Sequence, residues 1–129
     1  MKPNSWAHSL FAITLFTEDL QATKGFYQHA FELPVKYEDA NSAVFKFGET
    51  LINLLSVTEA AELVKPAKVA GPTVGARAVF TIHVEDVDAM CAKLTARGVN
   101  LLNGPMDRPW GIRTASFSDP AGNIWEIAK

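Results

Sequence analysis

The chain has 129 residues, 48% of them hydrophobic, which suits one domain with a sizeable core. Its 12 basic and 14 acidic residues give a formal charge of -2 without a basic cluster, which argues against a nucleic-acid partner. The apolar runs are too short to span a membrane, residues 1–9 lack a signal-peptide pattern, and the single Cys91 suits a reducing compartment, so we expect a cytoplasmic protein that binds no membrane.

The first half of the chain predicts one strand, one helix and three more strands. Residues 10–17 alternate as a strand, and Asp19 is a typical helix N-cap. Apolar residues from Leu20 to Ala30 then fall on one helical stripe. Short strands follow in "ELPVKYED", "SAVFKF" and "TLINLLSV", the last two joined by a tight turn at Gly48 and Glu49. The predicted order is β-α-β-β-β.

The second half repeats this order after a linker. Residues 58–77 are rich in Pro and Gly, and residues 60–64 could form a helical turn. A strand in "AVFTIHV" precedes a helix that Asp86 caps and Gly98 ends. Strands in "VNLL", "IRTASFS" and "NIWEIA" complete the repeat, with "NGPMDRPWG" as a long loop. We therefore predict a single α+β domain, 1–129, built from two modules, 7–57 and 78–129.

The turn "DPAGN" leads into the last strand, where the carboxylate of Glu126 stands between two apolar residues. Alternation places Trp125 and Ile127 on one face, where we expect them to pack on the second helix, and Glu126 on the other. A carboxylate there needs a partner, and Arg113 on the neighbouring strand is one option. Asp107 and Arg108 are expected to pair with each other on the preceding loop.

Two segments, "TLFTEDLQATKGFYQHAFELPV" and "RPWGIRTASFSDPAGNIWEI", resemble the vicinal oxygen chelate superfamily of glyoxalase I, bleomycin resistance proteins and extradiol dioxygenases. With the repeated β-α-β-β-β order, the resemblance covers nearly the whole chain. It implies curved mixed sheets around a cleft, with helices outside and metal ligands on the inner strands. It also implies a homodimer, because relatives build or complete their clefts between subunits.

The resemblance implies four positions for metal-binding side chains, and most of them hold residues that do not bind metals in this sequence. The positions correspond to Ala12, Asn53, Val79 and Glu126. Two of these side chains are hydrocarbons, and an amide with one carboxylate falls short of a usual transition-metal donor set. The three histidines have no metal-binding spacing. We expect neither a metal nor another cofactor.

The implied cleft face mixes apolar and polar side chains, which suits a small organic ligand. The candidate ligand-binding residues are Thr14, Phe16, Asn53, Leu55, Thr81, Trp110 and Arg113. Glu126 and His83 are candidate acid and base groups. Each has a structural alternative: Glu126 as an inherited ligand held by an ion pair, and His83 as a solvated rim residue. Trp110 either walls the ligand groove or seals the core or the dimer contact.

Three hypotheses about function follow. The preferred one is metal-independent binding or sequestration of a small organic molecule, for example an antibiotic, in a partly apolar cleft. The second is an enzyme that uses Glu126 and His83, either a metal-free lyase or isomerase or a metal-dependent glyoxalase or dioxygenase type. The third is a dimeric domain with a vestigial cleft.

Overall fold

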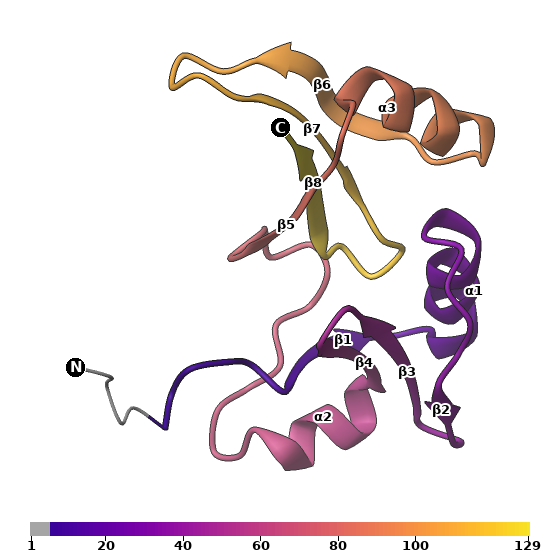
Figure 1. Cartoon of the computed structure of the whole chain (residues 1–129). Coiled ribbons are helices and arrows are strands. Elements are labelled where there is room, and N and C mark those ends of the chain that lie inside the picture. The colour runs from indigo at the N-terminus through magenta and orange to yellow at the C-terminus, as the bar shows by residue number, and fades with distance from the viewer. Residues whose placement is uncertain (1–5) are drawn as a thin grey trace.

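The computed structural model describes residues 6–129 as two similar modules (Figure 1). The first module contains β1 (Ala12–Thr17), α1 (Leu20–Ala30), β2 (Tyr37–Glu38), β3 (Ser42–Phe47) and β4 (Thr50–Ser56), followed by α2 (Val57–Leu63). The second module contains β5 (Val79–His83), α3 (Val87–Ala96), β6 (Leu101–Asp107), β7 (Arg113–Ser118) and β8 (Ile124–Ala128).

Each module forms a four-stranded mixed sheet. The first sheet has the order β1-β4-β3-β2 and the second the order β5-β8-β7-β6. In both, the first and last strands of the module pair in parallel and the remaining pairs are antiparallel. The predicted α+β class and the duplicated β-α-β-β-β order are confirmed. The two sheets stay separate and do not close into one barrel (Figure 1).

The main helices begin where the sequence predicts them. Asp19 Oδ1 accepts a hydrogen bond from the Ala22 amide at 3.1 Å, and Asp86 Oδ1 accepts one from the Ala89 amide at 3.0 Å. Such N-caps satisfy amides that have no partner inside the helix and each contribute about 1 kcal/mol. Gly98 follows α3 with a φ of 83°, the left-handed conformation expected of a helix-ending glycine.

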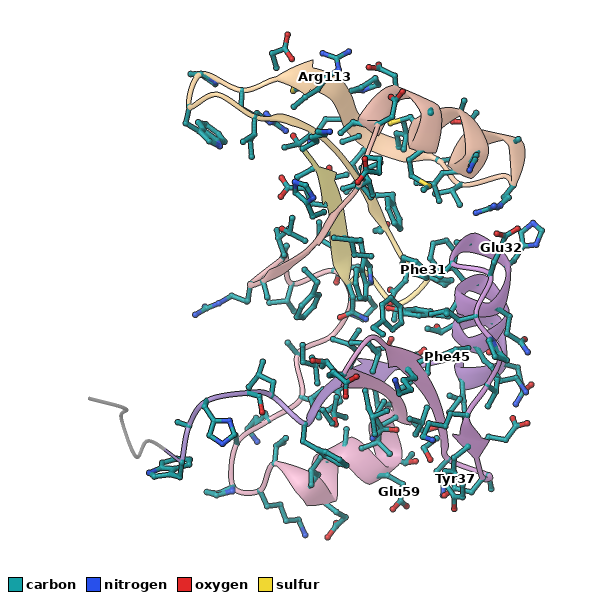
Figure 2. All side chains as sticks on the ribbon, viewed as in Figure 1. Phe31, Glu32, Tyr37, Phe45, Glu59 and Arg113 are labelled. Carbon is teal, nitrogen blue, oxygen red and sulfur yellow. The ribbon has the colours of Figure 1, made fainter. Side chains whose placement is uncertain are left out.

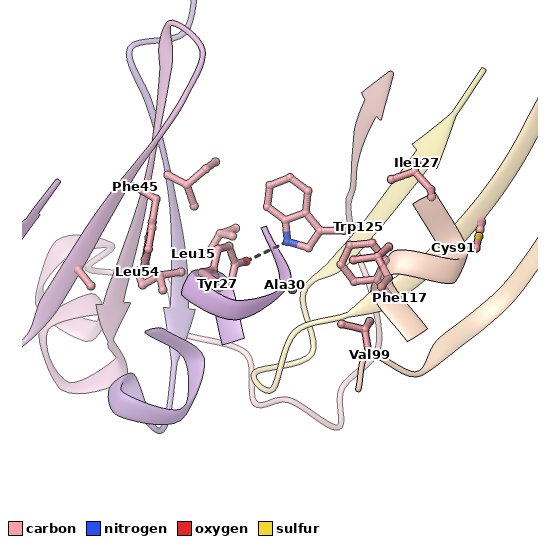
Figure 3. Close-up of a cluster of buried hydrophobic side chains, with 14 of the residues drawn as sticks. Leu15, Tyr27, Ala30, Phe45, Leu54, Cys91, Val99, Phe117, Trp125 and Ile127 are labelled. Atoms are coloured by element: carbon pink, nitrogen blue, oxygen red, sulfur yellow. Dashed lines mark hydrogen bonds between the residues drawn. The ribbon is translucent and has the colours of Figure 1, made fainter. Parts of the chain in front are cut away.

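The core lies between the two sheets, with α1 inserted between them (Figure 3). Leu15 and Leu54 of the first sheet face this core from one side, and Phe117 and Trp125 of the second sheet face it from the other. Trp125 packs on α1, where its ring lies 6.0 Å from that of the fully buried Tyr27. The prediction that Trp125 packs on the second helix is therefore wrong, because the modules share one core.

Two predicted boundaries also change. The linker 58–77 contains most of α2, whose Ala60 is fully buried, and α2 lies on the face of the first sheet opposite α1 (Figure 1). The second strand of the second module is longer than predicted, because β6 continues to Asp107 through two register shifts on β7. Much of the predicted loop "NGPMDRPWG" is therefore strand.

No helix within residues 6–129 is both long enough and apolar enough to cross a membrane. The expectation that the chain begins without a signal peptide falls largely on residues 1–5, which lie outside the described residues.

Candidate functional site

Glu126 lies on the face of the second sheet that points away from the core. This surface, called the outer face below, carries Thr81, His83, Asn103, Thr114, Ser116 and Glu126, as strand register and alternation require. Thr81 Oγ1 donates a hydrogen bond to Glu126 Oε1 at 2.8 Å. The predicted acid is therefore held by a hydroxyl. The other candidate, His83, is exposed and pairs in register with Ala128. This pair lies two residues further along the strands than the pair of Thr81 and Glu126.

Arg113 does not partner Glu126. Its side chain lies on the α3 side of the sheet (Figure 2), where Nε and Nη2 donate to the two carboxylate oxygens of Asp88, both at 2.9 Å. Nη1 donates to Asp107 Oδ1 at 3.0 Å. Hydrogen bonds from Arg113 hold the pKa of Asp88 below its ordinary value. By strand alternation, the Arg113 side chain points to the opposite side of the sheet from Glu126. The prediction that Arg113 pairs with Glu126 is therefore wrong.

Arg108 is a residue that the sequence analysis misplaced. Because Asp107 binds Arg113, the predicted pair between Asp107 and Arg108 does not form. Arg108 instead lies over the outer face, where Nε donates to Thr114 Oγ1 at 2.8 Å and Nη2 donates to Asn103 Oδ1 at 2.9 Å. The only signal in the sequence was a cation next to a strand end, and the error in the end of β6 concealed its direction.

The candidates from the first sheet lie elsewhere. Asn53 Nδ2 contacts Thr14 Oγ1 at 3.4 Å, and Asn53 Oδ1 is a buried oxygen without a hydrogen-bond partner. Leu55 pairs in register with Phe16. Thr14 and Phe16 line a small groove of about 270 Å³ together with residues 70–78 and Ile124. None of the three cavities described for residues 6–129 unites this set with Glu126 or His83.

A further cavity lies between the sheets, and no pattern in the sequence predicted it. Its volume is about 690 Å³, and its residues are Ile13, Phe31, Leu33, Lys46, Phe47, Gly48, Thr50, Ile52, Val79, Phe80, Thr81, Ile82 and Trp125. Of the predicted site residues it includes Thr81 alone. Its aromatic side chains have the sequence signature of core residues, so no pattern distinguished a cavity wall from filled core.

One wall of this cavity is fixed by a buried polar cluster. The Tyr27 hydroxyl donates to Asp119 Oδ2 at 2.8 Å and accepts from Trp125 Nε1 at 2.9 Å. Burial, followed by the nearby Asp119 carboxylate, raises the pKa of Tyr27, so the phenol stays protonated. Asp119 also accepts hydrogen bonds from the amides of Ala121 and Asn123, which confirms its predicted role in the "DPAGN" turn.

Trp110 is 69% exposed on the hairpin between β6 and β7 and lines none of the three cavities described. Trp110 therefore does not seal the core, and its roles in walling a ligand groove or in a dimer contact stay predictions.

The four positions where the resemblance places metal ligands do not fit a transition-metal centre. Ala12 and Val79 have no donor atom, while Asn53 and Glu126 lie on different sheets. Within residues 6–129, no three His, Cys, Asp or Glu side chains lie close enough together to hold a metal ion.

Comparison with known proteins gives a consistent family. Residues 9–127 match the model of the Glyoxalase/Bleomycin resistance protein/Dioxygenase superfamily. The uncharacterized protein YraH of Bacillus subtilis (strain 168) is 35% identical over 124 residues, which cover 93% of this chain and 97% of YraH.

Solved structures share the fold. A glyoxalase/bleomycin resistance protein/dioxygenase from Nocardioides has a TM-score of 0.86 at 22% identity, covering 97% of this chain and 85% of its own. A lactoylglutathione lyase from Agrobacterium tumefaciens has a TM-score of 0.75 at 23% identity, covering 98% of this chain and 94% of its own. At these identities the likeness concerns the fold alone.

Proposed function

The chain belongs to the Glyoxalase/Bleomycin resistance protein/Dioxygenase superfamily, and on this premise we propose that it binds a small organic molecule, without a metal ion, in the cavity between its two sheets. The observation that carries the proposal is the cavity itself, whose volume of about 690 Å³ is within the usual range for ligand sites. Sequestration of a toxic compound such as an antibiotic is the concrete form of this function.

The cavity walls define the chemistry of the ligand. Phe31, Phe47 and Trp125 form a contiguous aromatic surface with ring centroids 5.0 to 5.2 Å apart, and Phe80 joins it at 5.4 Å from Trp125. Aromatic faces favour planar, largely apolar molecules. Lys46 is the only charged residue of the lining, and its Nζ donates a hydrogen bond to the Gly48 carbonyl oxygen. The ligand is therefore a planar apolar molecule with no more than one anionic group.

A homodimer is part of the proposal. The predicted site residues of the first sheet and those of the outer face of the second sheet lie on separate surfaces of one chain, and a second copy could bring one set against the other. Exposed apolar side chains, including Phe11, Leu63 and Trp110, support such an interface. Light scattering after size-exclusion chromatography measures the mass; a monomer at micromolar concentration contradicts this part. The single cysteine supports a cytoplasmic site of action.

The test of the binding function is a thermal-shift screen with aromatic antibiotics, glycopeptides and thioether conjugates. A ligand at 100 times its dissociation constant stabilises the fold by about 2.7 kcal/mol. Thr50→Trp fills the cavity from a half-buried lining residue that shares the core-facing side of β4 with Ile52 and Leu54, so it should abolish the shift. The matched control is Val74→Trp at a position that is 70% exposed and outside the cavity, and it should retain the shift. An equal shift in both variants would place the ligand elsewhere.

An enzyme is the second candidate, because Glu126 and His83 share the outer face about 7 Å apart along neighbouring strands. An enzyme of this kind needs Glu126 as a proton acceptor, so Glu126→Gln should abolish turnover while ligand binding in the cavity persists. Unchanged turnover in this variant excludes the role. A dimer that binds none of the screened compounds would support the vestigial cleft.

A further inference from the structure

The outer face of the second sheet holds a positioned cation that the binding function above does not use. Arg108 donates through Nε to Thr114 and through Nη2 to Asn103, so both of its partners are neutral oxygen atoms. Within residues 6–129 it forms no ion pair. Arg97 and Arg113, by contrast, each pair with a carboxylate. No carboxylate of the described residues therefore compensates the positive charge of Arg108.

The two hydrogen bonds also orient the guanidinium. Thr114 is fully buried, so its hydroxyl is a fixed anchor beneath the arginine. A guanidinium has five N–H donors, and Nε and one hydrogen of Nη2 are used here. The hydrogens of Nη1 and the second hydrogen of Nη2 remain, and this is the fork that binds a carboxylate or phosphate through two parallel hydrogen bonds. The arginine is thus preorganised for an oxyanion.

A hydrogen-bond acceptor lies one pleat repeat away on the same face. Ser116 follows Thr114 by two residues in β7 and pairs in register with Glu126 of β8. The backbone of Glu126 therefore lies about 7 Å along the strand direction from the row formed by Thr114 and Ala128. Glu126 Oε1 accepts from Thr81, while Oε2 accepts no hydrogen bond from the described residues. The outer face therefore offers both the N–H donors of Arg108 and a carboxylate oxygen of Glu126.

We propose that the outer face of the second sheet is a second ligand site, at which Arg108 binds an oxyanion and Glu126 binds an amine or other donor of the same molecule. The ligand class is a small bifunctional molecule that carries a carboxylate or phosphate and an amine. His83 flanks the site, since it lies in the row of Thr114 and Ala128. This site is separate from the cavity between the sheets and does not rest on the proposed function.

The anion arm is tested with inorganic phosphate. Phosphate is titrated into ¹⁵N-labelled protein at constant ionic strength, and the Arg108 Nε–H resonance and the Thr114 amide are followed by NMR. We expect saturable shifts in the wild type. Arg108→Gln should weaken phosphate binding, read from the Thr114 amide, at least about tenfold. Lys68→Gln removes the same charge from an exposed residue in the segment after α2 and should leave the affinity unchanged. Equal weakening in both variants, or no saturable shift in the wild type, overturns the proposal.

The contact between Glu126 and an amine is tested with 4-(aminomethyl)benzoate and benzoate. Both probes carry a carboxylate, and only the first carries an amine. The amine-containing probe should bind more tightly, and Glu126→Gln should reduce its affinity to that of benzoate. Equal affinities of the two probes for the wild type would contradict the role of Glu126. Thr50→Trp should change neither affinity, whereas it abolishes binding in the cavity. Loss of probe binding in this variant would place the probes in the cavity and refute the second site.

Discussion

The Tyr27 hydroxyl in α1 accepts a hydrogen bond from Trp125 Nε1 in β8 at 2.9 Å, so one buried oxygen joins the two modules. Tyr27→Phe would leave Trp125 Nε1 buried without an acceptor, and it would also remove the hydrogen bond to Asp119 Oδ2, which would keep only the one from Asn123 Nδ2. An unsatisfied buried group costs about 1–3 kcal/mol. We expect the free energy of unfolding to fall by about 2–4 kcal/mol in urea denaturation. Tyr37→Phe is the matched control: Tyr37 is exposed and should change stability by less than about 0.5 kcal/mol. Equal effects of the two substitutions would show that the buried cluster contributes nothing special.

Gly104→Ala should destabilise the second module. Gly104 has a φ of 84°, and a Cβ there would lie 2.4 Å from the Thr114 carbonyl oxygen and 2.7 Å from the Ala115 Cα. These are backbone atoms of β7, so β6 would have to separate from it, at a cost of about 2–4 kcal/mol from strain and overpacking. Gly25→Ala, in the exposed part of α1 with no atom within 4 Å, should instead stabilise the chain by about 0.5–1 kcal/mol. The urea midpoints of both variants check this, and a loss of stability in both would contradict it.

The ion pair between Asp88 and Arg113 predicts a specific pH dependence. The pKa of Asp88 lies below its ordinary value of 3.8, so the folded chain binds fewer protons at this group than the unfolded chain. Its contribution to stability is present above 3.8 and is lost as the pH falls through the depressed pKa. The wild type should therefore lose stability on acidification more steeply than Asp88→Asn. Urea midpoints measured from pH 6 to pH 3 test this, with Glu59→Gln expected to run parallel to the wild type. Parallel curves for Asp88→Asn and the wild type would refute it.

Cys91 should react slowly with thiol reagents in the folded chain. Its side chain is buried on α3, and burial raises its pKa, so little thiolate forms. With dithionitrobenzoate at pH 8 we expect slow labelling of the native chain and rapid, complete labelling in denaturant. Rapid labelling of the native protein would show that α3 opens readily.

The sequence predicted the parts of the fold that depend on local chemistry. The Asp19 and Asp86 caps, the Gly98 helix end and the "DPAGN" turn are each decided by a few neighbouring residues. Strand parity likewise placed Glu126 on the face away from the core.

The candidate site was less predictable, because it depends on how the modules meet. Trp125 packs on a helix 98 residues away, and no periodicity reports that contact. Arg108 and Arg113 lie five residues apart, yet they point to opposite faces, because Arg113 pairs in register with Asp107, the residue before Arg108. The cavity between the sheets is lined by aromatic residues that a pattern cannot distinguish from filled core.

The contact between Tyr27 and Asp119 spans 92 positions of the chain. During synthesis, α1 leaves the ribosome long before the residues that complete its buried face. Until β8 emerges, Tyr27 and the apolar surface around it stay exposed to solvent, where they are a site for chaperone binding or misassociation. The duplicated halves are therefore one cooperative folding unit, and neither half should persist as a stable fragment when expressed alone.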